Sequence, residues 1–183
     1  ALAPFQSLLA AEIKLPKPNT KGKLSVEAAM VSKKSVRTFA QTPLTSSQVS
    51  QMLWAANGDL PVDAIAEATR KVIPSAGAIY PLEIYLMTGK DTVEGVPAGV
   101  YRYNAQNNSL ELVLEGDNRT QLAYACLGQL FISRAPAVVI IAGAIGRSAA
   151  KYGPHGYKYT YMEAGNANQN MYLQAESIGL HMA

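Results

Sequence analysis

The sequence predicts one globular domain that contains both helices and strands. Its 183 residues include 49% hydrophobic and 16% charged side chains, a composition that suits a folded core and argues against disorder or a coiled coil. Apolar residues recur at helical spacing behind capping residues, and two alternating segments flank a polar Asn-Asn turn. The predicted order is helices, strand, hairpin, helix, strand, helix, with no internal repeat and no visible domain boundary.

Residues 1–23 predict an extended arm that precedes a domain at 24–183. The stretch 13–23 is rich in Pro, Lys, Asn and Gly, which disfavour a regular element. Residues 1–11 are apolar and end in small side chains, like the tail of a secretory signal, but they lack its basic start. We therefore expect a cytoplasmic protein, with export as the alternative.

Two helices are predicted in the first third of the chain. Ser25 suits an N-cap, and residues 26–32 then read as a short helix. Thr45 and Gln48 form a capping-box pattern ahead of apolar residues at helical spacing, and Gly58 is a natural stop. The second helix therefore runs from about residue 46 to Gly58.

Four strands follow from β-branched, aromatic and alternating segments. Residues 82–88 predict a buried strand, and 99–103 with 109–114 predict an antiparallel hairpin around Asn107-Asn108. Residues 137–145 are apolar throughout, which predicts a strand covered on both faces.

Further helices are predicted between and after these strands. Residues 63–69 suggest a helical turn, Asp117 can cap a helix that runs to about Ser133, and 159–177 predict a long last helix. The small and apolar residues 179–183 then suggest the entry to another strand.

Charge and cysteine content limit the function classes. The net charge of +3 is modest, and the basic residues near the N-terminus lack interleaved aromatics, which argues against nucleic-acid binding. Those residues form either a solvated face or an anion site. The lone Cys126 and two histidines exclude an intramolecular disulfide and a Cys/His zinc cage, so we expect no metal site. No apolar run reaches the length of a membrane span.

Two segments have the chemistry of a binding site. Lys33, Ser35 and Arg37 alternate, so in an extended conformation their side chains share one side and offer a point charge, a hydroxyl and a planar fork to a phosphate. In the segment 74–83, two prolines flank Gly77, which predicts a rigid loop that presents backbone amides to a ligand. An ordinary connecting loop is the alternative for the second segment.

These segments belong to a larger set of motifs. The set comprises Lys33-x-Ser35-x-Arg37-x-Phe39, Pro43-Leu44-Thr45, Leu53-Trp54-Ala55-Ala56, Pro74 to Glu83, Gly99-Val100-Tyr101-Arg102-Tyr103 and Glu163-Ala164-Gly165-x-x-x-Gln169-Asn170. Together the motifs resemble the nitroreductase superfamily from about Lys23 onward, and the most similar branch is that of the SagB-type, thiazoline-oxidase-like flavoproteins.

The resemblance implies an α+β sandwich with a mainly antiparallel sheet flanked by helices. In this family, two chains form an intertwined homodimer that exchanges terminal segments and binds FMN at each of two subunit interfaces. The resemblance also implies that the C-terminal strand of the sheet lies beyond Ala183.

The cofactor contacts implied by the resemblance come from two chains. Lys33, Ser35 and Arg37 would hold the flavin phosphate and ribityl chain. Pro74, Ser75, Ala76 and Gly77 of the other subunit would line the flavin ring. Gln169 would approach the flavin from the last helix, as could Glu163, with helix capping and dimer packing as alternative roles for both.

One position departs from many relatives. Lys33 stands where they have arginine, which replaces a bidentate contact by a point charge and should weaken phosphate binding.

Lys151 and Tyr152 match a Lys-Tyr pair that serves acid and base roles in azoline-oxidising members of the superfamily. The alternative is that the pair only opens the last helix. His155 is expected in a surface loop, His181 as a packed residue, and Asn170 in a structural hydrogen bond.

The resemblance implies an FMN-dependent oxidoreductase that transfers electrons from NAD(P)H to a nitroaromatic, quinone or similar acceptor. The alternative within the superfamily is a SagB-type dehydrogenase that oxidises azoline heterocycles in a peptide with partner proteins. From another class, a non-catalytic protein that binds a flavin or nucleotide would use the same phosphate site.

Overall fold

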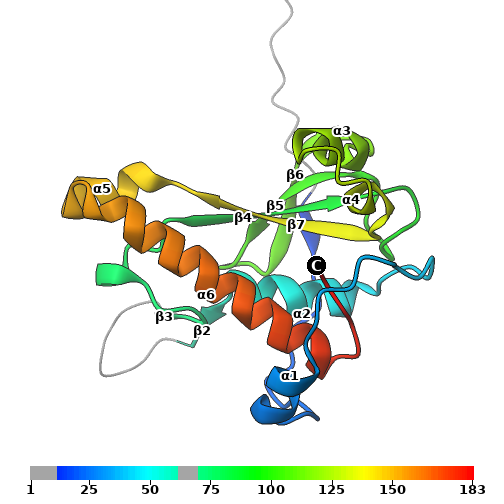
Figure 1. The fold of residues 1–183 in the computed structure, drawn as a ribbon, viewed down its shortest axis with the longest axis horizontal. Coiled ribbons are helices and arrows are strands. Elements are labelled where there is room, and N and C mark those ends of the chain that lie inside the picture. Colours follow the sequence, from blue (N-terminus) through cyan, green and yellow to red (C-terminus); the bar gives the residue numbers. More distant parts are fainter. Residues whose placement is uncertain (1–11, 62–69) are drawn as a thin grey trace, which may run out of the picture.

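Figure 1 shows the fold of the computed structural model, which describes residues 12–61 and 70–183. The proposed signal remnant at 1–11 and the proposed helical turn at 63–69 lie outside the described residues.

A five-stranded sheet forms the centre of the molecule. All of its neighbouring strands are antiparallel, which confirms the α+β class with an antiparallel sheet. In spatial order the strands are β1 (Glu12–Lys14), β6 (Ser109–Glu115), β5 (Gly99–Asn104), β4 (Leu82–Thr88) and β7 (Ala137–Gly143).

The sheet corrects two of the sequence predictions. Residues 12–14 of the expected arm are strand β1, whose Ile13 pairs with Leu110 of β6. The apolar strand β7 ends at Gly143 and is half-buried along most of its length, whereas complete cover was predicted. It is an edge strand, with a neighbour on one side only among the described strands.

The first two helices begin as predicted. In α1 (Val26–Ser32) the Ser25 hydroxyl accepts from the Ala28 amide, and in α2 (Ser46–Asn57) Thr45 and Gln48 form the complete capping box. Gly58 ends α2. A short pair of strands, β2 (Asp59–Leu60) and β3 (Arg70–Lys71), follows.

The predicted helix from Asp117 to Ser133 is two shorter helices, α3 (Arg119–Ala125) and α4 (Phe131–Arg134). Between them Leu127 and Gly128 have φ of 60° and 74°, a left-handed conformation that a continuous helix does not allow.

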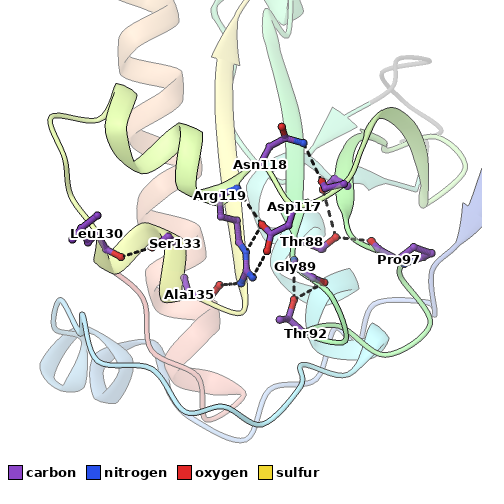
Figure 2. A network of polar contacts seen from close by, with 12 residues as sticks. Thr88, Gly89, Thr92, Pro97, Asp117, Asn118, Arg119, Leu130, Ser133 and Ala135 are labelled. Atoms are coloured by element: carbon purple, nitrogen blue, oxygen red, sulfur yellow. Dashed lines mark hydrogen bonds and ion pairs between the residues drawn. The ribbon is translucent and has the colours of Figure 1, made fainter.

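Arg119 ties this region to the sheet. Its guanidinium donates to both carboxylate oxygens of Asp117 and to the Ala135 carbonyl ahead of β7 (Figure 2).

Two helices follow β7. Helix α5 (Ile145–Tyr152) ends at Gly153, and α6 (His155–Ser177) then crosses the sheet, so that α5 projects at one end and α1 lies near the other (Figure 1). The two helices are closely packed at Gly156, where an added Cβ would lie 2.5 Å from the Ala149 nitrogen. Lys151 and Tyr152 are the last two residues of α5. They do not open the last helix, which was the alternative role predicted for them, because α6 begins at His155.

The core lies between the sheet and the helices α2 and α6. Leu53 of α2 and Met171 of α6 pack with Ile84, Leu86 and other buried strand residues. At the end of the chain, Met182 forms an isolated parallel bridge with Ser35, and its carbonyl accepts from the Val36 amide at 3.0 Å. The segment that carries Lys33, Ser35 and Arg37 is thus held beside the C-terminal end of α6.

Candidate functional site

The loop between β3 and β4 has an unusual backbone. It contains a short 3-10 turn, η1 (Ala76–Ala78), and positive φ values at Gly77 (61°), Ala78 (55°) and Tyr80 (49°). Residues other than glycine adopt such angles at a cost of about 1–3 kcal/mol each. The loop is therefore strained, and surrounding contacts must hold it in this conformation.

Those contacts come from one buried carboxylate on α6. Glu163 is 3% exposed, and its Oε1 accepts from the Ser75 hydroxyl and from the Ala76 amide, each at 3.0 Å. The Ser75 oxygen in turn accepts from the Tyr80 amide at 2.8 Å. The second oxygen of Glu163 is buried and meets no hydrogen-bond donor within residues 12–61 and 70–183.

Lys151 and Tyr152 lie against the same loop. A Cβ built at Gly77 would come within 2.4 Å of the Tyr152 hydroxyl and 2.7 Å of the Lys151 Nζ. The Lys151 Nζ lies 5.5 Å from the centre of the Tyr152 ring. The Tyr152 and Tyr159 rings are nearly perpendicular, with their centres 5.0 Å apart. The structure thus places the Lys-Tyr pair beside the loop that the sequence singled out.

An ion pair fixes α5 relative to the strand that follows the loop. Arg147, one turn before Lys151, pairs with Glu83 of β4. Helix side chains four residues apart share a face, so this contact orients the end of α5 that carries Lys151.

The predicted phosphate residues divide between two elements. Lys33 lies 5.5 Å from the centre of the Tyr172 ring on α6, and the Ser35 hydroxyl is 3.3 Å from the Tyr172 hydroxyl. Arg37 instead lies 5.4 Å from the centre of the Phe131 ring on α4. The structure therefore brings Lys33 and Ser35 together at Tyr172 and directs Arg37 toward α4.

Tyr172 is not among the cofactor-binding residues that the sequence predicts. Its spacing carries no sign of a polar role, because the contact depends on how residues 33–36 cross α6.

A mainly apolar groove of about 660 Å³ opens beside Arg37. Segment 36–44, α2, β7, α6 and the last residues of the chain line it. The loop 74–77 and the pair 151–152 are not part of this lining, so the groove is separate from the strained loop.

The strained loop and the pair of Lys33 and Ser35 contact opposite faces of α6. Glu163, which holds the loop, precedes Tyr172, which meets Lys33 and Ser35, by nine residues. This separation is about 13 Å along the axis and about two and a half turns, so the two side chains leave the helix on opposite sides. Gln169 lies between them in sequence and is exposed.

Other polar residues have structural surroundings. Asn170 donates to the Val72 carbonyl at 3.3 Å, in agreement with the expected structural role. His155 is exposed, as expected, but begins α6 and does not lie in a loop. His181 is exposed, against the expectation of a packed residue, because its imidazole reaches Glu176 at 3.0 Å. That hydrogen bond lowers the pKa of Glu176.

The described parts of the chain contain neither a metal-binding cluster nor a helix that could span a membrane. No three side chains among His, Cys, Asp and Glu gather there into a set that could hold a metal ion. None of the helices there combines the length and apolar composition that crossing a bilayer requires.

Comparisons with known proteins point to one family. The sequence profile described as "Nitroreductase family" matches residues 30–183. The protein MJ1384 of Methanocaldococcus jannaschii, a nitroreductase by name, is 40% identical over 169 residues, which cover 92% of this chain and 80% of that protein. A crystal structure described as a nitroreductase from Ralstonia eutropha has a TM-score of 0.74 at 29% identity, with 93% of this chain and 73% of that chain covered.

Similarity extends to peptide-processing proteins. The microcin B17-processing protein McbC of Escherichia coli is 34% identical over 118 residues, which span 62% of this chain and 43% of McbC. The Escherichia coli microcin synthetase McbBCD complex with truncated pro-MccB17 contains a chain of the same fold, at a TM-score of 0.63 and 24% identity, with 91% of this chain and 64% of that chain covered.

Proposed function

The chain belongs to the nitroreductase family, and we propose that it is an FMN-dependent oxidoreductase that passes electrons from NAD(P)H to a nitroaromatic, quinone or similar acceptor. The observation that carries this proposal is the contact of Lys151 and Tyr152 with the strained loop at Gly77. A rigid loop that presents its backbone, with a cation and a phenol beside it, suits a planar ligand whose edge gains and loses protons.

The other half of the proposed site fits a phosphate ester. Lys33, Ser35 and Arg37 offer an ammonium, a hydroxyl and a guanidinium from one short segment, which are donors that a phosphate accepts. Lys33 and Ser35 are close to Tyr172, so its hydroxyl can join them at the phosphate or ribityl chain. Arg37 would turn from the Phe131 ring toward the phosphate or contact it from that side.

We propose that two copies of the chain complete each site. The loop meets α6 at Glu163, whereas Lys33 and Ser35 meet it at Tyr172 on the opposite face, so one flavin cannot contact the loop and this pair within a chain without passing around the helix. Exposed apolar side chains on the first half of α6, at Tyr157, Tyr161 and Met162, supply a surface for a second copy. A homodimer would set the loop of one chain opposite the phosphate residues of the other.

When bound, FMN would supply the chemistry of hydride and electron transfer between a reduced nicotinamide and an acceptor. The residues of this chain bind and orient it. Tyr152 can donate a proton near the loop, and the Lys151 side chain lies beside its ring.

A second candidate function is oxidation of azoline heterocycles in a peptide. The similarity to McbC, which is named for processing microcin B17, favours it, and so does the position of the Lys-Tyr pair at the loop. The chain covers less than half of McbC, so partner proteins and peptide recognition would need to come from elsewhere.

The experiment is a visible spectrum of the purified protein after incubation with FMN, followed by anaerobic addition of NADH or NADPH. We expect flavin absorption bands that bleach on addition of nicotinamide and return with a quinone or nitroaromatic acceptor. Protein that stays colourless contradicts the proposal. Bound flavin that is inert to both nicotinamides but is reduced by an azoline peptide supports the second candidate, and bound flavin inert to all of them indicates a non-catalytic binding protein.

A further inference from the structure

We propose that Glu163 is the positioning residue of the site, because it holds the strained loop of residues 74–80 in the conformation that meets the flavin ring. This inference rests on the proposed function for the identity of the ligand. The role of Glu163 in fixing the loop follows from its own hydrogen bonds, whatever the ligand.

Glu163 occupies a position of α6 where an apolar residue is expected. The buried residues Glu163, Ala167, Met171 and Ala175 follow one another at intervals of four, so the carboxylate belongs to the helical stripe that faces the core. It lies eight residues inside the helix, which excludes helix capping as its role. A carboxylate buried at such a position destabilises the fold unless its hydrogen bonds compensate.

Glu163 and Ser75 together hold both ends of the strained turn, Glu163 directly at the start and Ser75 at the end. Its Oε1 receives the Ser75 hydroxyl and the Ala76 amide at the start, while the Ser75 oxygen receives the Tyr80 amide at the end. Between these anchors lie the left-handed Gly77 and Ala78. One carboxylate thus fixes a segment that would relax without it.

Glu163 influences Lys151 and Tyr152 indirectly, because it fixes the loop that contacts both side chains. Gly77 is packed against the Tyr152 hydroxyl and the Lys151 ammonium, so a loop that relaxes changes the space beside both groups. Glu163 acts through Ser75 and Ala76. It is therefore a positioning residue, and the Lys-Tyr pair provides the chemistry.

The test compares Glu163→Ala with Glu163→Gln. Glutamine keeps one oxygen that can accept from Ser75 and Ala76, whereas alanine removes both contacts. We measure amide hydrogen exchange at Ala76 and Tyr80 by NMR, the Kd for FMN, and the kcat and KM for the acceptor. Leu53→Ala is the control, since it deletes a core side chain of α2 and leaves the Glu163 contacts in place.

We expect Glu163→Ala to speed exchange at both amides at least tenfold, to raise the Kd for FMN roughly tenfold and to lower kcat more than it changes KM. Glu163→Gln should restore most of each loss, and Leu53→Ala should leave local exchange in the loop and the Kd near their wild-type values. Ser75→Ala, which breaks the same relay without a change in the core, should repeat the effect at Tyr80.

Exchange and FMN affinity in Glu163→Ala that match those in Leu53→Ala would overturn the inference. If Glu163→Ala does not fold, Ser75→Ala with unchanged exchange at Tyr80 would overturn it. If the wild-type protein binds no FMN, the proposed function fails, and the exchange data alone decide whether Glu163 holds the loop.

Discussion

The hydroxyl of Tyr152 lies so close to Gly77 that no side chain fits at position 77 without a shift of Tyr152. A Cβ at Gly77 would come within 2.4 Å of that hydroxyl, and the backbone there has a φ of 61°. Residues 75 positions apart in the chain thus meet at one point, where the strained loop touches the end of α5.

Gly77→Ala should impair the site more than it impairs the fold. The new Cβ must displace Tyr152 and Lys151, and we expect kcat to fall at least tenfold, while the left-handed conformation costs about 1 kcal/mol of stability. Steady-state kinetics and thermal unfolding measure the two effects. Gly95→Ala is the matched control, because Gly95 has a φ of 71° and no atom of the described residues lies within 4 Å of a Cβ added there, so it should lower stability alone. Equal losses of activity in both variants would contradict the prediction.

Tyr152→Phe and Lys151→Met should each lower kcat about a hundredfold while the Kd for FMN changes little, as loss of a proton donor or its cationic neighbour does. The phenylalanine keeps the ring edge that meets Tyr159, so the fold should persist. Stopped-flow spectroscopy measures the rate of flavin reduction and reoxidation. Tyr124→Phe, at an exposed position of α3, is the control. Unchanged rates in both site variants would show that the pair only terminates α5.

Arg37→Ala should weaken FMN binding roughly tenfold to a hundredfold, because charge-assisted hydrogen bonds contribute about 1.5–3 kcal/mol each. Fluorescence titration with FMN, and with riboflavin in parallel, measures the change. The loss should be specific to FMN, since riboflavin has no phosphate. Lys34→Ala removes the same charge from the same segment and should leave the Kd nearly unchanged. An equal effect in both variants would indicate general attraction and no specific phosphate contact.

The ion pair of Arg119 and Asp117 should support stability in a pH-dependent way (Figure 2). Hydrogen bonds from Arg119 lower the pKa of the Asp117 carboxyl in the folded state. The stabilisation is therefore complete above the unfolded pKa of about 3.9 and is lost as the pH falls through the lower folded value. Arg119→Ala, which removes a buried, multiply bonded guanidinium, should cost about 2 kcal/mol at pH 7.

Urea unfolding at pH 7 and near pH 3 checks this prediction. The difference between wild type and Asp117→Asn should shrink at the lower pH, where the wild-type carboxyl is protonated in part. A difference that stays constant with pH would contradict it.

Elements that depend on local signals were predictable from the sequence. The capping box of Thr45 and Gln48 defines the start of α2 by its own hydrogen bonds, and strand β4 has the predicted bounds because its apolar residues are buried in the centre of the sheet. The loop at Gly77 was recognisable for the same reason, since glycine permits a left-handed backbone and the flanking prolines fix φ locally.

Contacts between distant segments were not predictable in this way. Strand β1 has only three residues, and it exists because β6 offers an edge to pair with. The break at Leu127 occurs at a leucine, which carries no local signal for a left-handed backbone. Glu163 had several possible roles from sequence, and only the packing of α6 below the loop brings its carboxylate to Ser75 and Ala76.

Complementation between variants shows whether two chains share each flavin site, as proposed. Arg37→Ala damages the phosphate half, and Lys151→Met damages the loop half. A mixture of the two variants is assembled by co-expression and assayed at an FMN concentration that fills wild-type sites but leaves Arg37→Ala sites empty. If each site combines halves of two chains, an equal mixture should regain about one quarter of wild-type turnover, because half of the dimers are mixed and each of these holds one intact site. Turnover that stays at the level of the two variants alone would show that each site is built within one chain.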